Sequence, residues 1–168
     1  TPNNDAKIIT QGDAAGYNGA SYSGFVNGET SAELTGTLAI TRSNAGTEAA
    51  ATYTGVLVPT GYTSGNYEIT FTNGNYQTLP AQQLLIRLQN VSNFYGTTAS
   101  YVVTSAEYLD GSGTTLRALT QTAQNANTYT FSDGLGGSVT FTVAPTGAIT
   151  SRAGYLAAGN YTLSGTNT

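Results

Sequence analysis

The sequence contains no cysteine, histidine, methionine or tryptophan. Without Cys and His, zinc and redox-metal sites lose their usual nitrogen and sulfur ligands, and thiol or serine–histidine catalysis loses its nucleophile or its base. The lack of cysteine does not assign a compartment, because cytosolic proteins and exported proteins both manage without disulfides. These absences remove several catalytic chemistries outright.

Charge is scarce as well. Charged residues make up 8% of the 168 residues, and nine acids against five bases leave a net charge of −4. The five cations are scattered along the chain, whereas a nucleic-acid surface needs a clustered basic stripe. The longest apolar runs, such as LLI at 84–86, are far too short to span a bilayer. We therefore expect neither a nucleic-acid partner nor membrane insertion.

The first residues, TPNNDAK, do not show the charged-then-apolar pattern of a signal peptide. Because its first residue is Thr1 rather than methionine, we expect a mature chain or an excised fragment.

What the sequence does contain is the pattern of β-strands. In NYEITFT (66–72), Tyr67, Ile69 and Phe71 alternate with polar residues, which is the period of a half-buried strand. GSVTFTV (137–143) repeats this pattern. Further strands are predicted at 6–10, 35–42, 51–58, 83–89, 99–109, 127–131, 147–151 and 159–165. NG, DG and PTG sequences between them predict turns.

Helix signals are few. NGETSAELTG (27–36) predicts one or two helical turns, with Thr30 as N-cap and Glu33 three residues later as in a capping box. TTLRALTQTAQ (114–124) is the other candidate, although its threonine content argues equally for irregular structure. The sequence therefore predicts a mostly β protein with little helix.

Two pairs of similar segments indicate an internal repeat. YNGASYSGF (17–25) resembles YGTTASYVV (95–103), and GYTSGNYEITFTNG (61–74) resembles GYLAAGNYTLSGTN (154–167). Similar elements that recur in the same order, roughly 80 to 95 residues apart, are typical of a tandem repeat.

The repeat divides the chain into two modules. GNYQTLPAQQ (74–83) has no strong alternation and contains Pro80, so it is predicted to be the linker. We expect two tandem small antiparallel β modules, residues 1–80 and 81–168. Each is either β-grasp-like or an immunoglobulin-like sandwich, depending on whether a short helix packs across the sheet.

The leading apolar strand, SGFVNGETSAELTG (23–36) and the closing GNYEITFTNG (65–74) resemble the MBG repeats of large bacterial surface adhesins. In these repeats a Y-G motif is followed by G-[LF]-V-N-G-[DE]-T and by an ending N-Y-x-I-x-F. The matching positions are Tyr17, Gly19, Tyr22, Gly24, Phe25, Val26, Asn27, Gly28, Glu29, Thr30, Leu34, Gly36, Asn66, Tyr67, Ile69 and Phe71. Residues 94–168 resemble the related YDG type more loosely, since the opening FYGTTASY lacks the aspartate.

This resemblance implies a role outside the cell. Such modules belong to filamentous-haemagglutinin-like adhesins, which are secreted by the two-partner route and act in attachment or biofilm formation. It implies a stalk or adhesive segment at the cell surface or in the medium. The implied partners are a host or matrix glycan or protein, and neighbouring repeats of the same long chain.

Catalysis would have to use carboxylates. A glycosidase needs two that face each other across a cleft, and no spacing in the sequence predicts such a pair. Glu68 lies on the outward face of its predicted strand. We therefore expect a non-enzymatic protein, with a carboxylate-dependent hydrolase as the least favoured alternative. The nine acids are Asp5, Asp13, Glu29, Glu33, Glu48, Glu68, Glu107, Asp110 and Asp133.

A glycan-binding, lectin-like module is the main alternative to a stalk. Sugar sites place aromatic rings against apolar sugar faces and use amides and hydroxyls for the sugar hydroxyls. NFYGTTASY (93–101) and GYTSGNY (61–67) offer such groups near turns. The competing interpretation is that tyrosines pack at module ends and asparagines turn the chain. The candidate ligand residues are Tyr62, Tyr67, Tyr95 and Tyr101.

Two further chemistries are weaker. Asp110 and Asp133 each place one carboxylate in a glycine-rich turn, whereas a calcium loop needs several oxygen ligands, so ordinary Asp-Gly turns are favoured. Lys7, the sole lysine, lies in the predicted first strand, where an isopeptide bond to Asn or Asp is an alternative for the first module alone. We expect no metal and no cofactor.

Overall fold

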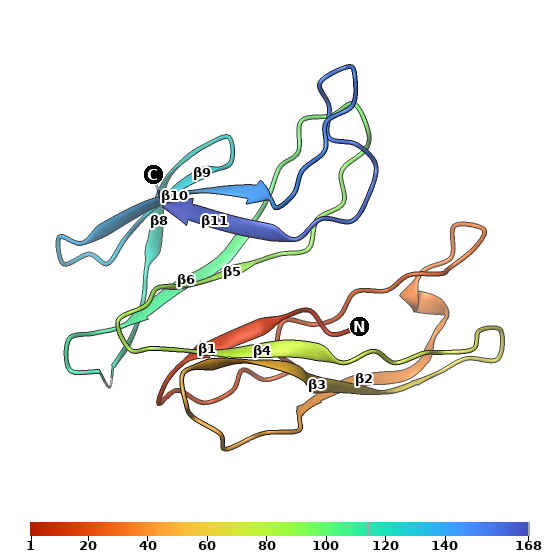
Figure 1. Ribbon diagram of the computed structural model, residues 1–168, viewed down its shortest axis with the longest axis horizontal. Coiled ribbons are helices and arrows are strands. Elements are labelled where there is room, and N and C mark those ends of the chain that lie inside the picture. The colour runs from red at the N-terminus through yellow and green to blue at the C-terminus, as the bar shows by residue number, and fades with distance from the viewer. Residues whose placement is uncertain (114, 168) are drawn as a thin grey trace. The chain divides into compact units, whose positions relative to one another are not determined.

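The computed structural model describes residues 1–113 and 115–167 (Figure 1). The chain divides into two compact units, Thr1–Gln83 (unit 1) and Leu84–Thr168 (unit 2). Both are built from strands, and the described residues include a single three-residue 3-10 turn. The prediction of a mostly β protein with little helix and small antiparallel sheets is confirmed.

Unit 1 holds one four-stranded sheet. Its strands are β1 (Asp5–Ile8), β2 (Thr35–Arg42), β3 (Ala51–Thr63) and β4 (Gly74–Leu79), in the order β1-β4-β3-β2 (Figure 1). β1 runs parallel to β4, and the other pairs are antiparallel. The first and last strands lie side by side as in a β-grasp module, but the connection at 9–34 carries only the 3-10 turn η1 (Ser31–Glu33).

Unit 2 holds two smaller sheets that are antiparallel throughout. The three-stranded sheet has the order β5-β6-β7, and the four-stranded sheet has the order β11-β10-β9-β8 (Figure 1). The strands are β5 (Leu85–Leu88), β6 (Val103–Leu109), β7 (Leu116–Ala118), β8 (Thr120–Asn125), β9 (Thr128–Ser132), β10 (Ser138–Pro145) and β11 (Leu163–Asn167).

The prediction of a strand at 66–72 is wrong, because residues 64–73 lie outside the strands. Tyr67 and Ile69 are half-buried as expected, but Phe71 is exposed. β3 pairs with β4 only as far as Leu57. Beyond that point β3 contains Pro59, which has no N–H to donate. The segment at 64–73, which leads back to β4, therefore does not form a hydrogen-bonded ladder with β3.

The predicted linker at 74–83 is also wrong over most of its length. It contains β4, an inner strand of the sheet in unit 1. Its buried positions include Gly74, Tyr76 and Thr78. These residue types do not form the alternating apolar pattern by which a strand is predicted. Gly74 is required there because a Cβ would lie 2.7 Å from the carbonyl oxygen of Pro2.

The helix predictions fare differently. Thr30 caps η1 as expected, and its hydroxyl accepts the N–H of Ala32 at 3.3 Å, although only one 3-10 turn follows. The candidate at 114–124 is instead β7 and β8 over its described residues, since its threonines favour strand. The strand predicted at 147–151 is reduced to an isolated bridge between Thr150 and Leu156.

Candidate functional site

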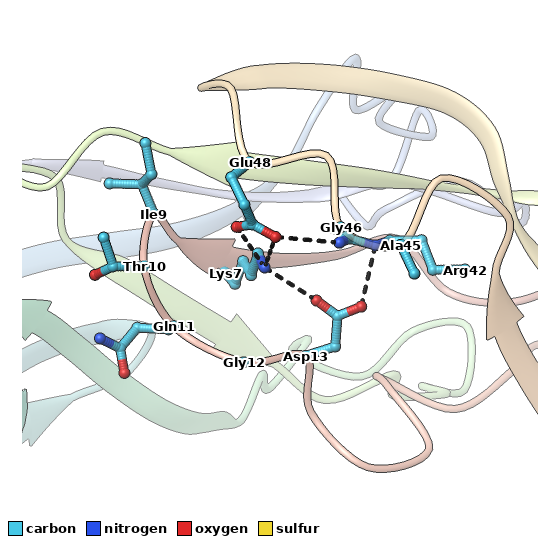
Figure 2. Close-up of a pocket in the computed structure, with 10 residues that line it drawn as sticks. All are labelled: Lys7, Ile9, Thr10, Gln11, Gly12, Asp13, Arg42, Ala45, Gly46 and Glu48. Atoms are coloured by element: carbon cyan, nitrogen blue, oxygen red, sulfur yellow. Dashed lines mark hydrogen bonds and ion pairs between the residues drawn. The ribbon is translucent and has the colours of Figure 1, made fainter.

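The densest group of charged side chains in unit 1 lies at one end of its sheet (Figure 2). Lys7 projects from β1, and its Nζ lies 2.7 Å from Glu48 Oε2 and 3.3 Å from Asp13 Oδ1. Arg42 ends β2, and its Nε lies 3.0 Å from Asp13 Oδ2. Two cations and two acids thus form one connected cluster, which we call the ion-pair cluster.

Both cations of the ion-pair cluster are removed from water. The side chains of Lys7 and Arg42 are 5% and 1% exposed, whereas those of Asp13 and Glu48 are 23% and 45% exposed. Burial of an unpaired cation costs roughly several kcal/mol. Lys7 and Arg42 can be buried here because the carboxylates of Asp13 and Glu48, which lie in loops, pair with them. The cluster therefore fixes the loops at 9–13 and 43–50 against the sheet.

Two tyrosines complete the cluster. The guanidinium carbon of Arg42 lies 4.6 Å from the ring centroid of Tyr76, within the range of a cation–π contact. The hydroxyls of Tyr76 and Tyr17 donate to the two oxygens of Asp13 at 3.2 and 3.1 Å. Burial, and then the nearby Asp13, raises the pKa of the Tyr76 phenol above its usual value. Asp13 thus accepts two tyrosine hydroxyls and forms ion pairs with both cations.

A hollow of about 580 Å³ opens beside the ion-pair cluster (Figure 2). Its lining residues are Lys7, Ile9, Thr10, Gln11, Gly12, Asp13, Arg42, Ala45, Gly46 and Glu48. Two positive and two negative side chains line it, and each is already engaged in an ion pair. The hollow therefore offers polar surface without an uncompensated charge.

The aspartates considered for calcium serve their own turns. Asp133 Oδ1 accepts the N–H groups of Leu135 and Gly137, both at 2.8 Å, and these bonds hold the pKa of the Asp133 carboxyl below its usual value. Asp110 accepts from the side chain and N–H of Ser112, which likewise lowers its pKa. In the described part of the chain, no group of three or more Asp or Glu is placed to hold a metal ion.

Of the four tyrosines considered for a ligand, Tyr62 and Tyr67 belong to unit 1. Tyr62 lies in edge contact with Tyr22, at 6.1 Å between ring centroids. Burial, and then the Tyr62 hydroxyl, raises the pKa of Tyr22 to about 12. Tyr67 packs edge-on against Phe25.

In unit 2 the two candidate tyrosines, Tyr95 and Tyr101, differ in solvent exposure. Tyr101 is 6% exposed and belongs to the core, where its carbonyl oxygen accepts the Tyr129 hydroxyl. Tyr95 is 62% exposed and lies 6.1 Å from Tyr155, ring centroid to ring centroid. Of this pair, Tyr95 is exposed to solvent and Tyr101 is not.

Sequence reasoning missed the surroundings of Tyr95. Phe94 is 87% exposed and Tyr155 is 43% exposed. Arg152 belongs to the same turn as Tyr155, and no ion pair of Arg152 is recorded among the described residues. We call Phe94, Tyr95, Arg152 and Tyr155 the aromatic tip.

Sequence reasoning also missed that Asp13, Arg42 and Glu48 meet Lys7. The available signal was a lone lysine and an arginine placed inside strand patterns of a chain with few charges. A cation in such a position needs a carboxylate partner, but the partners lie in loops whose paths the pattern does not predict.

Comparison with known proteins gives one match. Residues 1–77 match the family model of the MBG domain (YGX type). No curated protein and no solved structure gives a significant match to the chain. No helix among the described residues has the length and apolar character to cross a membrane.

Proposed function

Residues 1–77 form a module of the MBG domain family, YGX type, and from that premise we propose that the chain is a non-enzymatic segment of a large bacterial adhesin. It acts as a stalk or adhesive module at the cell surface or in the secreted protein, in attachment or biofilm formation. The family match is the observation that carries this proposal. The neighbouring repeats of the parent chain and a surface glycan or protein are its proposed partners.

The composition supports an exported role. A chain without cysteine needs no disulfide chemistry to fold after export. Its scarce surface charge makes its stability insensitive to changing salt outside the cell, since exposed ion pairs contribute little and are screened. Strand faces rich in threonine and asparagine combine β propensity with hydration.

The carboxylates support a non-enzymatic role. Asp13 and Glu48 each form ion pairs with Lys7 and Arg42, and Asp13 also accepts two tyrosine hydroxyls. Asp110 and Asp133 are engaged by their own turns. A general acid needs a free carboxyl with a raised pKa, as in glycosidases, and these acids are tied into structural contacts.

Competition separates the stalk role from the adhesive role. The parent protein is displayed on cells, and attachment to a surface is measured with and without an excess of the soluble 168-residue chain. An adhesive module should reduce attachment by competition. A stalk module should leave attachment unchanged, although deletion of its segment from the parent should reduce it. If neither the soluble chain nor the deletion changed attachment, the proposal would be contradicted.

A second candidate function, glycan binding, is favoured by the aromatic tip. Exposed Phe94, Tyr95 and Tyr155 offer ring faces to a sugar. Arg152 has no ion pair with another described residue, so its guanidinium can bind a carboxylate on that sugar. A neutral stalk surface gains nothing from three exposed rings, because they expose apolar area to water.

Titration with sialyllactose and with lactose tests this candidate, because the two sugars differ by one acidic residue. We expect saturable binding that Tyr155→Ala abolishes and that Arg152→Gln weakens for sialyllactose alone. Tyr22→Ala is the matched control, since Tyr22 is similarly exposed at 42% and pairs edge-on with another tyrosine in unit 1. Absence of binding to either sugar, or equal loss with the control, would argue against glycan binding at the aromatic tip.

A further inference from the structure

The sequence contains three Asn-Gly dipeptides, at 18–19, 27–28 and 73–74. An Asn-Gly pair is chemically labile because glycine lacks the Cβ that shields its amide nitrogen from the preceding side chain. The three pairs are identical in sequence, all lie in unit 1, and differ in their surroundings. The structure therefore decides which of them is free to react.

Two of the three pairs are held. The Asn18 side chain donates to the carbonyl oxygen of Asn4 at 3.3 Å, and the Gly19 N–H donates to the carbonyl oxygen of Gly16. The Asn73 side chain donates to the carbonyl oxygen of Gly55 at 3.0 Å, and Gly74 is buried as the first residue of β4. Reaction at either pair requires local opening of unit 1.

The third pair is open. Asn27 and Gly28 occupy the two central positions of a turn closed by the Glu29 N–H and the Val26 carbonyl oxygen at 2.9 Å. Both central residues have positive φ, 55° and 78°, as in the type I′ turn that favours Asn-Gly. Both are exposed, no atom lies within 4 Å of a Cβ built on Gly28, and no side-chain hydrogen bond of Asn27 is recorded among the described residues.

We propose that Asn27 is the site of spontaneous deamidation in this protein. The Gly28 amide nitrogen loses its proton to hydroxide and attacks Asn27 Cγ, forming a five-membered succinimide, and the side-chain nitrogen leaves as ammonia. Water then opens either carbonyl of the ring, giving aspartate or a β-linked isoaspartate. The net reaction exchanges one ammonia for one water and needs no oxidant, metal or enzyme.

The product changes the turn. The new carboxylate lowers the net charge from −4 to −5 (−4 − 1) and lies two residues from Glu29, which accepts the Tyr67 hydroxyl. The β-linked form adds one backbone carbon between Val26 and Glu29, so it cannot keep the same closing hydrogen bond. Deamidation therefore loosens the contact between this turn and Tyr67, and it marks the age of the exported chain.

Mass spectrometry of the intact 168-residue chain, aged at neutral and mildly alkaline pH, tests the proposal. Trypsin cleaves after Lys7 and Arg42 and places Asn18 and Asn27 in one peptide, so fragment ions must assign the site. We expect Asn27 to react at least about tenfold faster than Asn18 or Asn73, which corresponds to an opening cost of about 1.4 kcal/mol at the held pairs.

Two controls make the result decisive. In urea the three rates should converge, because the protection of Asn18 and Asn73 is structural. Asn27→Gln should remove the fast reaction while leaving the two slow sites unchanged. Equal rates at the three sites in the folded chain would overturn the proposal. A persistent excess at Asn27 in urea would also overturn it, since local sequence rather than structure would then set the rate.

Discussion

The two units bury different kinds of residue. Unit 1 buries Ile8, Leu57, Tyr76 and Leu79 together with polar or charged Asp5, Lys7, Arg42 and Thr78. Among its described residues, unit 2 buries only apolar and aromatic ones, including Tyr129, Phe131 and Phe141, whose rings stack at 6.0 and 5.7 Å between centroids. Similar opening and closing segments thus frame one core held by ion pairs and one held by aromatic packing.

The difference shows how a small β unit is stabilised in two ways. Apolar burial contributes free energy wherever the rings pack, so unit 2 depends on the volume of its side chains. Buried ion pairs contribute little net free energy but are costly to break, so unit 1 depends on the presence of every partner. Removal of a buried charge should therefore act on unit 1, whereas unit 2 should respond to the removal of buried volume.

The largest expected effect is from Phe141→Ala in unit 2. Phe141 is 2% exposed and stacks on both Tyr129 and Phe131, so we expect a loss of about 3–5 kcal/mol in the free energy of unfolding. Hydrogen-exchange mass spectrometry should show lost protection in residues 84–167 and unchanged protection in residues 1–83. Phe94→Ala is the matched control, since Phe94 is 87% exposed and its loss should change neither unit.

Next in size is Asp13→Asn in unit 1. It leaves buried Lys7 and Arg42 with only Glu48 as an acidic partner in the ion-pair cluster, and we expect a loss of about 3 kcal/mol. Hydrogen exchange should rise in residues 1–83 only. Glu68→Gln removes an exposed carboxylate as the control. Equal destabilisation by both variants would contradict the claim that the ion-pair cluster stabilises unit 1 more than an exposed carboxylate does.

A smaller effect is expected from acid on unit 2. The pKa values of Asp110 and Asp133 are lowered, so the stability they contribute is complete above the ordinary Asp pKa of about 3.9 and is lost as pH falls through the lowered values. Thermal unfolding should therefore move down in this window. Asp133→Asn should reduce the dependence of the unfolding temperature on pH. If this variant kept the whole pH dependence, Asp133 would not be a source of it.

The smallest expected effect is on the covalent mass of unit 1. Lys7 forms ion pairs with Asp13 and Glu48, and an amine that is engaged in two ion pairs is a poor nucleophile. We expect the intact mass to equal that of the sequence before ageing. A mass lower by one ammonia or one water would show an isopeptide bond and would make the first unit a covalently stapled module.

The sequence predicted fold class and several strands well. β2 coincides with its predicted range at 35–42, because TGTLAITR alternates and is bounded by turns. β4 was missed because Gly74, Tyr76 and Thr78 do not form an apolar stripe. The strand predicted at 66–72 was wrong because alternation reports which face is buried, not whether a neighbouring strand is present to pair.

Several features of the candidate sites were not predictable for a related reason. Asp110 and Asp133 were considered as isolated acids, and their turn hydrogen bonds are local enough to follow from Asp-Gly sequences. The ion-pair cluster joins residues up to 41 positions apart, and the aromatic tip joins the segments at 94–95 and 152–155. No local pattern brings such residues together.

The sequence by itself determined a β-rich chain without thiol, imidazole or basic-surface chemistry, and it contains two pairs of similar segments. These properties depend on residue type and on short-range periodicity. The tertiary structure alone decided that Lys7 and Arg42 are buried with Asp13, that Tyr101 is internal while Tyr95 is exposed, and that Asn27 is open while Asn18 and Asn73 are held. The physical reason is that burial and hydrogen bonding are set by which distant segments meet.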